Sequence, residues 1–155
     1  MDDGSTDGTL ELITGSNFKN TVLVSEPDDG IYDAINKGIG LARGEIIDLL
    51  HSDDYYSSVE ILAEVALKFL NPELDAVYAD ATFSQADNPS KIVKRYRSNI
   101  FRPQLIAWGW MPSHTTIFLR KKVFQQYGTY KIDYKIAADY EFVARIYSSG
   151  NVKSN

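Results

Sequence analysis

Short apolar runs alternate with helical periods along the chain, and this alternation predicts an α/β layer. The runs Thr21–Ser25 and Gly44–Leu50 read as strands, the second apolar enough to be covered on both faces. Between them, apolar and small residues recur at the spacing of one helix face, at Ile31, Ala34, Ile35 and Gly38. Strand–helix–strand order favours a sheet with a parallel portion.

The rest of the chain continues this alternation. We expect a helix from Ser57 or Ser58 through Leu70, a hairpin of strands Asp75–Phe83 and Lys91–Arg97, a strand at Thr115–Leu119, a helix at Lys121–Tyr127 ended by Gly128, and a helix at Ala138–Ser149. The stretch Ser98–Ser113 is less regular and holds both tryptophans. Because no linker or internal repeat interrupts the pattern, we expect residues 1–155 to form a single domain.

An acidic, glycine-rich stretch, MDDGSTDGT, opens the chain and has two readings from its residues alone. Thr6 or Asp7 can cap a helix that buries Leu10 and Ile13. A calcium loop of the EF-hand type begins well at Asp3, but its twelfth position is Thr14 rather than the required glutamate. The helix start is the favoured interpretation of this stretch by itself.

Composition removes several classes of function. The net charge of −5 gives no electrostatic footprint for nucleic acid, and the absence of cysteine excludes disulfides and thiolate metal sites. No apolar run reaches the ~18 residues of a membrane span. We therefore expect a cytoplasmic protein, either free or peripheral to the inner face of the membrane.

Three acidic loops are predicted to share one edge of the sheet, where ligands of open α/β sheets bind. They are Met1–Asp7, Ser25–Gly30 and His51–Asp54. The adjacent carboxylates of Asp53 and Asp54 suit a divalent cation such as Mg²⁺ or Mn²⁺, to which His51 could add an imidazole. The alternative is that these two aspartates start the next helix and favour its dipole.

Two residues of the C-terminal half also have both a structural and a chemical reading. Asp139 begins an amphipathic helix, so it is either an N-cap or a general base at the mouth of a pocket. His114 is either a structural hydrogen-bonding residue or part of the site. The sequence has no Walker loop, no Gly-x-Ser-x-Gly element and no nucleophile–base pair that would indicate covalent catalysis.

Taken in order, several motifs resemble those of family 2 glycosyltransferases over nearly the whole chain. They are Asp2-Asp-Gly-Ser-Thr-Asp-Gly-Thr9, Ser25-Glu-Pro-Asp-x-Gly-Ile-Tyr-Asp-Ala-x-Asn-Lys-Gly38, Ala42-x-Gly-Glu-Ile46, Ser52-Asp-Asp54, Met111-Pro-x-His114 and Ala138-Asp-Tyr-Glu141. The resemblance implies the GT-A fold of nucleotide-diphospho-sugar transferases, a Rossmann-like mixed α/β sheet flanked by helices. It also implies sugar transfer with inversion, as in surface polysaccharide or glycan synthesis.

The resemblance assigns roles to single residues. Asp139 matches the catalytic base, and Asp53, followed by Asp54, matches the metal-binding aspartate for Mn²⁺ or Mg²⁺. The residues expected on the nucleotide-sugar side are Asp2, Asp3, Asp29, Gly30, Asn36, Lys37, Asp53 and His114. His51 departs from the family, because it stands where the Asp-x-Asp element often has its first aspartate.

The resemblance also defines the expected partners and the competing functions. A nucleoside-diphosphate sugar would be the donor, a glycan or lipid-linked molecule the acceptor, and a homodimer the assembly considered. The family pattern normally has strands upstream of the Asp-Gly-Ser loop, so we expect a domain truncated at its N-terminus. A non-catalytic relative that binds nucleotide weakly or serves as an interaction module is the main alternative, and a metal-dependent phosphate hydrolase is a third.

Overall fold

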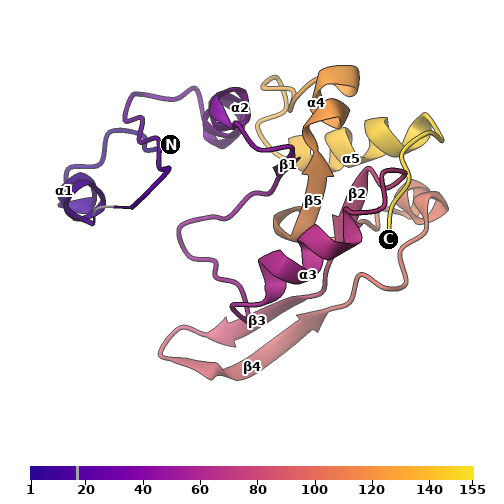
Figure 1. The fold of residues 1–155 in the computed structure, drawn as a ribbon, viewed down its shortest axis with the longest axis horizontal. Coiled ribbons are helices and arrows are strands. Elements are labelled where there is room, and N and C mark those ends of the chain that lie inside the picture. The colour runs from indigo at the N-terminus through magenta and orange to yellow at the C-terminus, as the bar shows by residue number, and fades with distance from the viewer. Residues whose placement is uncertain (17) are drawn as a thin grey trace.

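A three-stranded sheet forms the centre of the computed structural model, which describes residues 1–16 and 18–155 (Figure 1). Its strands are β1 (Ile46–Ile47), β2 (Ala76–Tyr78) and β5 (Ile117–Arg120), in the order β1-β5-β2. β5 lies between β1 and β2 and pairs antiparallel with each. Among the described residues, the expected parallel pairing appears only as isolated bridges, Asp2 with Ser25 and Ala76 with Ser154.

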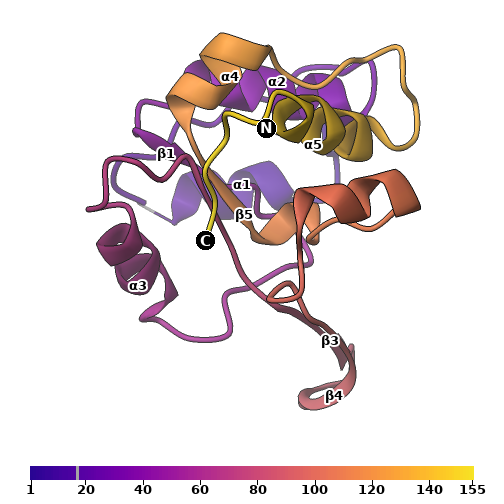
Figure 2. The ribbon, with the colours of Figure 1, turned by 90° about the vertical axis from the view of Figure 1, so that its right-hand side faces the viewer.

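The two faces of the sheet bury two separate hydrophobic clusters, as the alternation of side chains along a strand requires. Ile117 and Leu119 of β5 face the larger cluster with α2 (Ile31–Leu41), α4 (Lys121–Tyr127) and α5 (Ala138–Ser148). Phe118 points to the opposite face and packs in the smaller cluster with α3 (Ile61–Lys68). The view turned by 90° shows α3 on one side of the sheet and α4 and α5 on the other (Figure 2).

A long hairpin extends away from this layered body. It consists of β3 (Ala81–Gln85) and β4 (Asn88–Tyr96), which pair antiparallel with register shifts on either side of Ser84. The expected strand Asp75–Phe83 is thus divided between two sheets. The hairpin itself is confirmed, with a tighter turn than expected, at Ala86 and Asp87.

The predicted helices agree best with the structure. The α4 boundaries are the expected ones and α5 ends one residue early, whereas α3 begins three or more residues later than expected. The irregular stretch contains the 3₁₀ helix η1 (Pro103–Trp108), and a second 3₁₀ helix, η2 (His114–Thr116), begins just after it. In the described part of the chain, no helix is long and apolar enough to cross a membrane.

The N-terminal segment, which we define as residues 1–30, lies to one side of the body (Figure 1). It contains α1 (Thr9–Gly15), which begins after Gly8, while the Asp7 carboxylate accepts hydrogen bonds from the backbone and hydroxyl of Thr9. The expected strand Thr21–Ser25 does not form a ladder. Ser25 forms an isolated β-bridge with Asp2, and among the described residues no strand pairs with residues 21–24.

Candidate active site

Four side chains from distant parts of the chain meet at one edge of the body. Tyr32 comes from the first turn of α2, His51 from the loop after β1, His114 from the start of η2, and Asp139 from the second position of α5. The Tyr32 hydroxyl donates to one Asp139 oxygen at 3.0 Å, and His114 Nδ1 lies 3.2 Å from the other. The Nε2 atoms of His51 and His114 are 3.1 Å apart. The structure thus joins both histidines of the chain to Asp139.

Asp139 is held as a carboxylate. The hydrogen bond from His114 is the largest influence, and it outweighs burial to lower the pKa of Asp139 to about 2. The backbone of Tyr140, the charge of His114 and the Tyr32 hydroxyl act in the same direction. Burial and the charge of Asp139 in turn raise the pKa of Tyr32. Asp139 is therefore ionised at any physiological pH, as a proton acceptor must be.

The backbone before α5 turns sharply to deliver Asp139. Ala137 adopts a left-handed conformation with φ 66° and ψ 24°, one of two non-glycine residues with positive φ in the described chain. This conformation costs a residue with a Cβ about 1–2 kcal/mol, and such strain concentrates at functional sites. The N-cap reading of Asp139 is wrong, because Ala137 occupies the cap position and no side chain caps the helix.

Asp53 and Asp54 are exposed in a turn, in which the Asp54 amide donates a hydrogen bond to the His51 carbonyl. They do not start a helix, since α3 begins at Ile61. Within residues 1–16 and 18–155, no three His, Asp or Glu side chains cluster closely enough to enclose a metal ion. The two carboxylates fit a hard cation that takes most of its ligands from water and substrate phosphate, as Mg²⁺ commonly does.

The two N-terminal acidic loops lie against each other, as expected. The Asp2 carboxylate accepts hydrogen bonds from the amides of Gly4 and Ser5 and the hydroxyls of Ser5 and Ser25, and these bonds lower its pKa to about 2, the Ser25 bond most. Asp3 accepts from the Asp28 amide at 2.9 Å. The Asp2 and Asp3 carboxylates therefore stabilise the conformation of the two loops and the contact between them.

The predicted donor-side residues in and before α2 are also bound within the protein. Lys37 Nζ contacts Glu26, Asp28 and Asp33 at 3.1, 2.6 and 3.0 Å, and these carboxylates raise its pKa. The Asn36 side-chain nitrogen donates to the Tyr130 carbonyl, and its side-chain oxygen accepts from the Tyr130 amide. The Asp29 amide donates to Asp33, and Gly30 has a φ of 106° that favours glycine at the start of α2.

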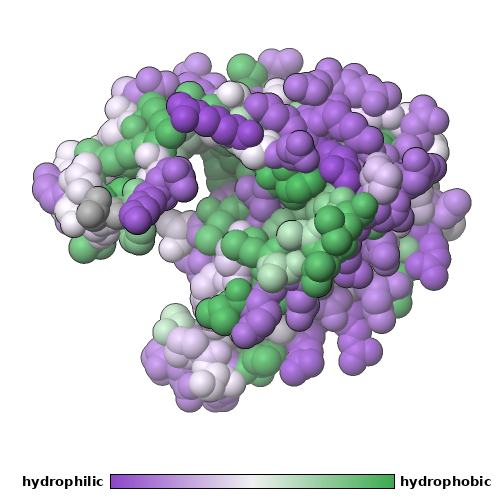
Figure 3. Space-filling model, viewed as in Figure 1, coloured by the Kyte–Doolittle hydropathy of each residue, from purple (hydrophilic) through white to green (hydrophobic). Residues whose placement is uncertain are grey.

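An open hollow lies between Met1, α2 and the His51 loop. Its volume is about 450 Å³, and its lining joins Met1, the apolar side of α2, and residues 47–52. The space-filling view shows a deep notch on this side of the molecule, with apolar surface inside it (Figure 3). Asp48 lines the hollow, and burial raises its pKa to about 6.

Sequence reasoning missed two members of the site. Tyr32 lies inside the Gly-Ile-Tyr-Asp-Ala motif, but its spacing gives no sign of a contact with Asp139, which is 107 residues away. The sequence suggests His51 as a metal ligand beside Asp53 and Asp54 and gives no sign of its contact with His114. The sequence contains two histidines, and the structure brings them into contact. The small number of histidines is the one feature of the sequence that could have suggested a shared site.

Comparison with known proteins decides the family. The family model described as "Glycosyl transferase family 2" matches residues 1–128. The chain belongs to glycosyl transferase family 2. Its α/β fold is the GT-A fold, because it matches the crystal structure of S. aureus TarS 1-349 with a TM-score of 0.76 over 99% of this chain and 47% of that one, at 20% identity.

Curated relatives agree with the family assignment. A "PGL/p-HBAD biosynthesis glycosyltransferase" of Mycobacterium bovis is 29% identical over 96% of this chain and 57% of its own length. The "Chondroitin synthase" of Pasteurella multocida is 33% identical over 75% of this chain and 12% of its own length. The family 2 chain thus spans a little over half the length of the mycobacterial relative. Family 2 relatives of this kind serve in glycan biosynthesis.

A second structural match has a ligand in its name. The mannosyltransferase PcManGT from Pyrobaculum calidifontis, in complex with GDP-Man and Mn²⁺, matches with a TM-score of 0.68 at 18% identity, over 99% of this chain and 43% of that one. TarS 1-349 has also been solved in complex with UDP. At these identities the matches establish the fold of the family 2 chain.

Proposed function

We propose that this chain is the catalytic part of an inverting glycosyltransferase that moves a sugar from a nucleoside diphosphate to an acceptor hydroxyl. The observation that carries the proposal is the Asp139 carboxylate, held ionised between His114 and Tyr32, with His114 in contact with His51 at the start of the Asp53–Asp54 loop. A family 2 chain with an ionised, oriented carboxylate at the edge of its sheet has the group that this reaction requires.

Asp139 is the general base of this reaction. The acceptor oxygen attacks the anomeric carbon, its proton passes to Asp139, and the bond from the anomeric carbon to the diphosphate oxygen breaks with its electron pair on that oxygen. A single displacement inverts the anomeric centre and needs no enzyme nucleophile. Because the pKa of Asp139 is about 2, the carboxylate is a weak base that accepts the proton only as the hydroxyl becomes acidic during attack.

The diphosphate side requires positive charge, which a divalent cation supplies when bound. Asp53 and Asp54 are the residues that would hold Mn²⁺ or Mg²⁺, which neutralises charge on a leaving diphosphate. The PcManGT complex with Mn²⁺ supports this assignment by analogy of fold. The remaining ligands would come from water and phosphate oxygens.

The donor would lie along the hollow between Met1 and His51. We propose that the nucleotide contacts the two N-terminal loops, through Asp2, Asp3, Asp29 and Gly30. Asn36 and Lys37 support the same surface by holding the Tyr130 backbone and the Asp28 loop, respectively. His114 would lie closest to the sugar, because it contacts the base Asp139.

We further propose the wider setting of the protein. Residues 1–155 act as one domain, the acceptor is a glycan or lipid-linked molecule, and the protein works at the cytoplasmic side of the membrane. The chain offers no basic surface pattern that would favour nucleic acid, since its net charge is −5. A homodimer is the assembly to test.

Calorimetry with UDP, GDP, CDP and dTDP, each with and without Mn²⁺, tests the donor assignment. We expect one of these nucleotides to bind in a metal-dependent manner, and Asp53→Asn to weaken that binding at least about ten-fold. Asp87→Asn, in the exposed turn of the β3–β4 hairpin, is the matched control and should bind as wild type. A folded wild-type protein that binds none of the four would contradict the proposal and favour a non-catalytic module.

A further inference from the structure

The two imidazoles of the chain face each other through the same ring nitrogen. His51 Nε2 and His114 Nε2 lie 3.1 Å apart, and the rings meet edge to face with centroids 5.3 Å apart. They come from two loops separated by 63 residues, one after β1 and one before β5. Without a ligand, a single proton can bridge the two nitrogens as an N–H···N hydrogen bond.

Asp139 fixes the orientation of one ring. Its Oδ2 lies 3.2 Å from His114 Nδ1, so Nδ1 is the nitrogen that donates to the carboxylate. The neutral tautomer that results leaves the lone pair of His114 on Nε2, directed at His51. A histidine whose other nitrogen donates to a carboxylate is the usual arrangement of a metal-ligating imidazole.

The spacing of the two nitrogens matches that of two ligands on one ion. Imidazole nitrogens bind Zn²⁺ at about 2.0–2.1 Å, so a separation near 3 Å corresponds to a ligand–metal–ligand angle of about 100°. A bound ion would take the place of the proton between the two nitrogens. Imidazole also selects the type of ion, because it suits Zn²⁺, Cu²⁺ and Ni²⁺ better than Mg²⁺, which prefers oxygen.

We propose that His51 and His114 form a binding site for a d-block divalent cation, with Zn²⁺ as its candidate occupant and Co²⁺ as the spectroscopic substitute for it. Among the residues that the structure describes, no third His, Asp or Glu completes a cluster with them. The His114 side chain is 32% exposed, so water or a substrate oxygen can take the remaining positions. Open positions are the mark of catalytic rather than structural sites.

Titration of the metal-free protein with Co²⁺, followed by its visible absorption, and with Zn²⁺ by calorimetry tests this site. We expect one ion per chain and a loss of affinity of at least about ten-fold in both His51→Gln and His114→Gln. Millimolar Mg²⁺ should not displace Co²⁺. Asp87→Asn is the control and should bind as wild type, and circular dichroism checks that each variant folds.

Imidazole nitrogen NMR of the wild-type protein gives a readout that does not depend on any variant. We expect the Nε2 signals of both histidines to shift together as Zn²⁺ is added, up to one equivalent. Unshifted signals at saturating Zn²⁺, or Zn²⁺ affinity lost in Asp53→Asn but unchanged in His51→Gln, would overturn the proposal. Neither measurement uses a nucleotide, so its result is separate from that of the proposed transferase activity.

Discussion

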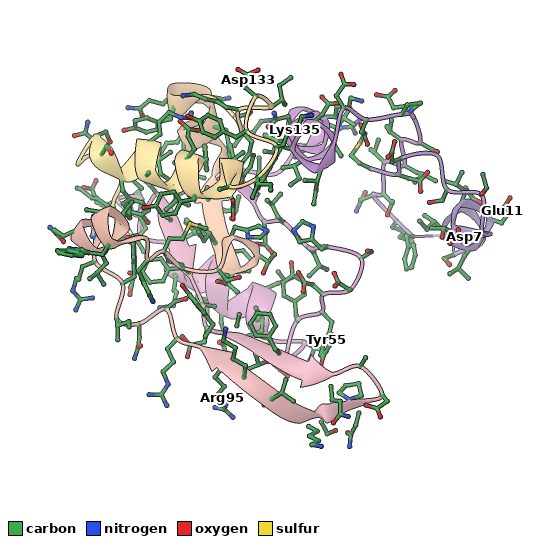
Figure 4. All side chains as sticks on the ribbon, turned by 180° about the vertical axis from the view of Figure 1, so that it is seen from behind. Asp7, Glu11, Tyr55, Arg95, Asp133 and Lys135 are labelled. Atoms are coloured by element: carbon green, nitrogen blue, oxygen red, sulfur yellow. The ribbon has the colours of Figure 1, made fainter. Side chains whose placement is uncertain are left out.

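Different forces stabilise the N-terminal segment and the remaining 125 residues, both of which Figure 4 shows from behind. The body, residues 31–155, packs two hydrophobic clusters against the two faces of one sheet. Among residues 1–16 and 18–30, no apolar residue is buried, and Asp7 and Glu11 lie far from the sheet on and next to α1. The segment is held by hydrogen bonds between its loops and by an ion-pair cluster around Lys37.

The difference also appears in two aspartates with opposite pKa shifts. Burial raises the pKa of Asp48 in the body to about 6, whereas hydrogen bonds lower the pKa of Asp2 in the segment to about 2. One carboxylate is desolvated and the other is solvated by protein groups. The proposed general base therefore lies in the packed body, whereas half of the proposed donor-side residues lie in a polar segment without buried apolar residues.

Removing a core ring should have the largest effect on stability. Phe142 is 1% exposed and stacks on Phe124 with centroids 5.1 Å apart. Phe142→Ala should reduce the free energy of unfolding by about 3–5 kcal/mol. Leu12→Ala, at a side chain 72% exposed in α1, should change it by less than about 0.5 kcal/mol. Chemical denaturation compares the two, and similar losses would remove the distinction between the regions.

Asp48 should make the free energy of unfolding depend on pH, with an effect of intermediate size. Folding raises the pKa of Asp48 from its unfolded value, near 4, to about 6. Its contribution to the free energy of unfolding is therefore complete below pH 4 and is lost as the pH rises through about 6. Allowing for solvent screening, wild type should lose about 1–2 kcal/mol relative to Asp48→Asn between pH 4 and 7. Denaturation at several pH values measures this difference, and a constant difference would contradict the assigned shift.

Asp2 should show the smallest, purely local effect. Asp2→Asn weakens the bonds to Ser5 and Ser25, so amide hydrogen exchange should accelerate at Gly4, Ser5 and Glu26 while the exchange of β5 stays unchanged. Because its pKa is lowered on folding, this contribution is present above pH 4 and is lost as pH falls through about 2. Faster exchange in β5 would show that the segment and the body unfold together.

The sequence predicted the helices of the body well because their signals are local. The apolar spacing from Ile31 and the stop at Gly128, with a φ of 80°, depend on residues that are close in the chain. The strands were harder, because Thr21–Ser25 has strand composition but forms a ladder only when a neighbour runs beside it. Asp75–Phe83 is divided between two sheets, with Asp80 after the first strand accepting from the Ser98 amide.

The site was predicted in its residues but not in its contacts. Family motifs identified Asp139, His114 and Asp53 as members, and the structure brings the first two together. The contacts of Tyr32 with Asp139 and of His51 with His114 join residues 107 and 63 positions apart. The first contact follows from the packing of α2 and α5 against the sheet, and the second from the pairing of β1 with β5, and no short pattern in the sequence encodes either.

Turnover in Asp139→Asn at full donor occupancy tests the central claim most directly. The substitution keeps the size of the side chain but removes the base, so transfer or hydrolysis of the donor sugar should fall about 10²–10⁴-fold. Nucleotide affinity, measured by calorimetry on the same protein, should remain within about two-fold of wild type, because the donor contacts lie on other residues. Turnover near the wild-type rate, at equal donor occupancy, would contradict the account.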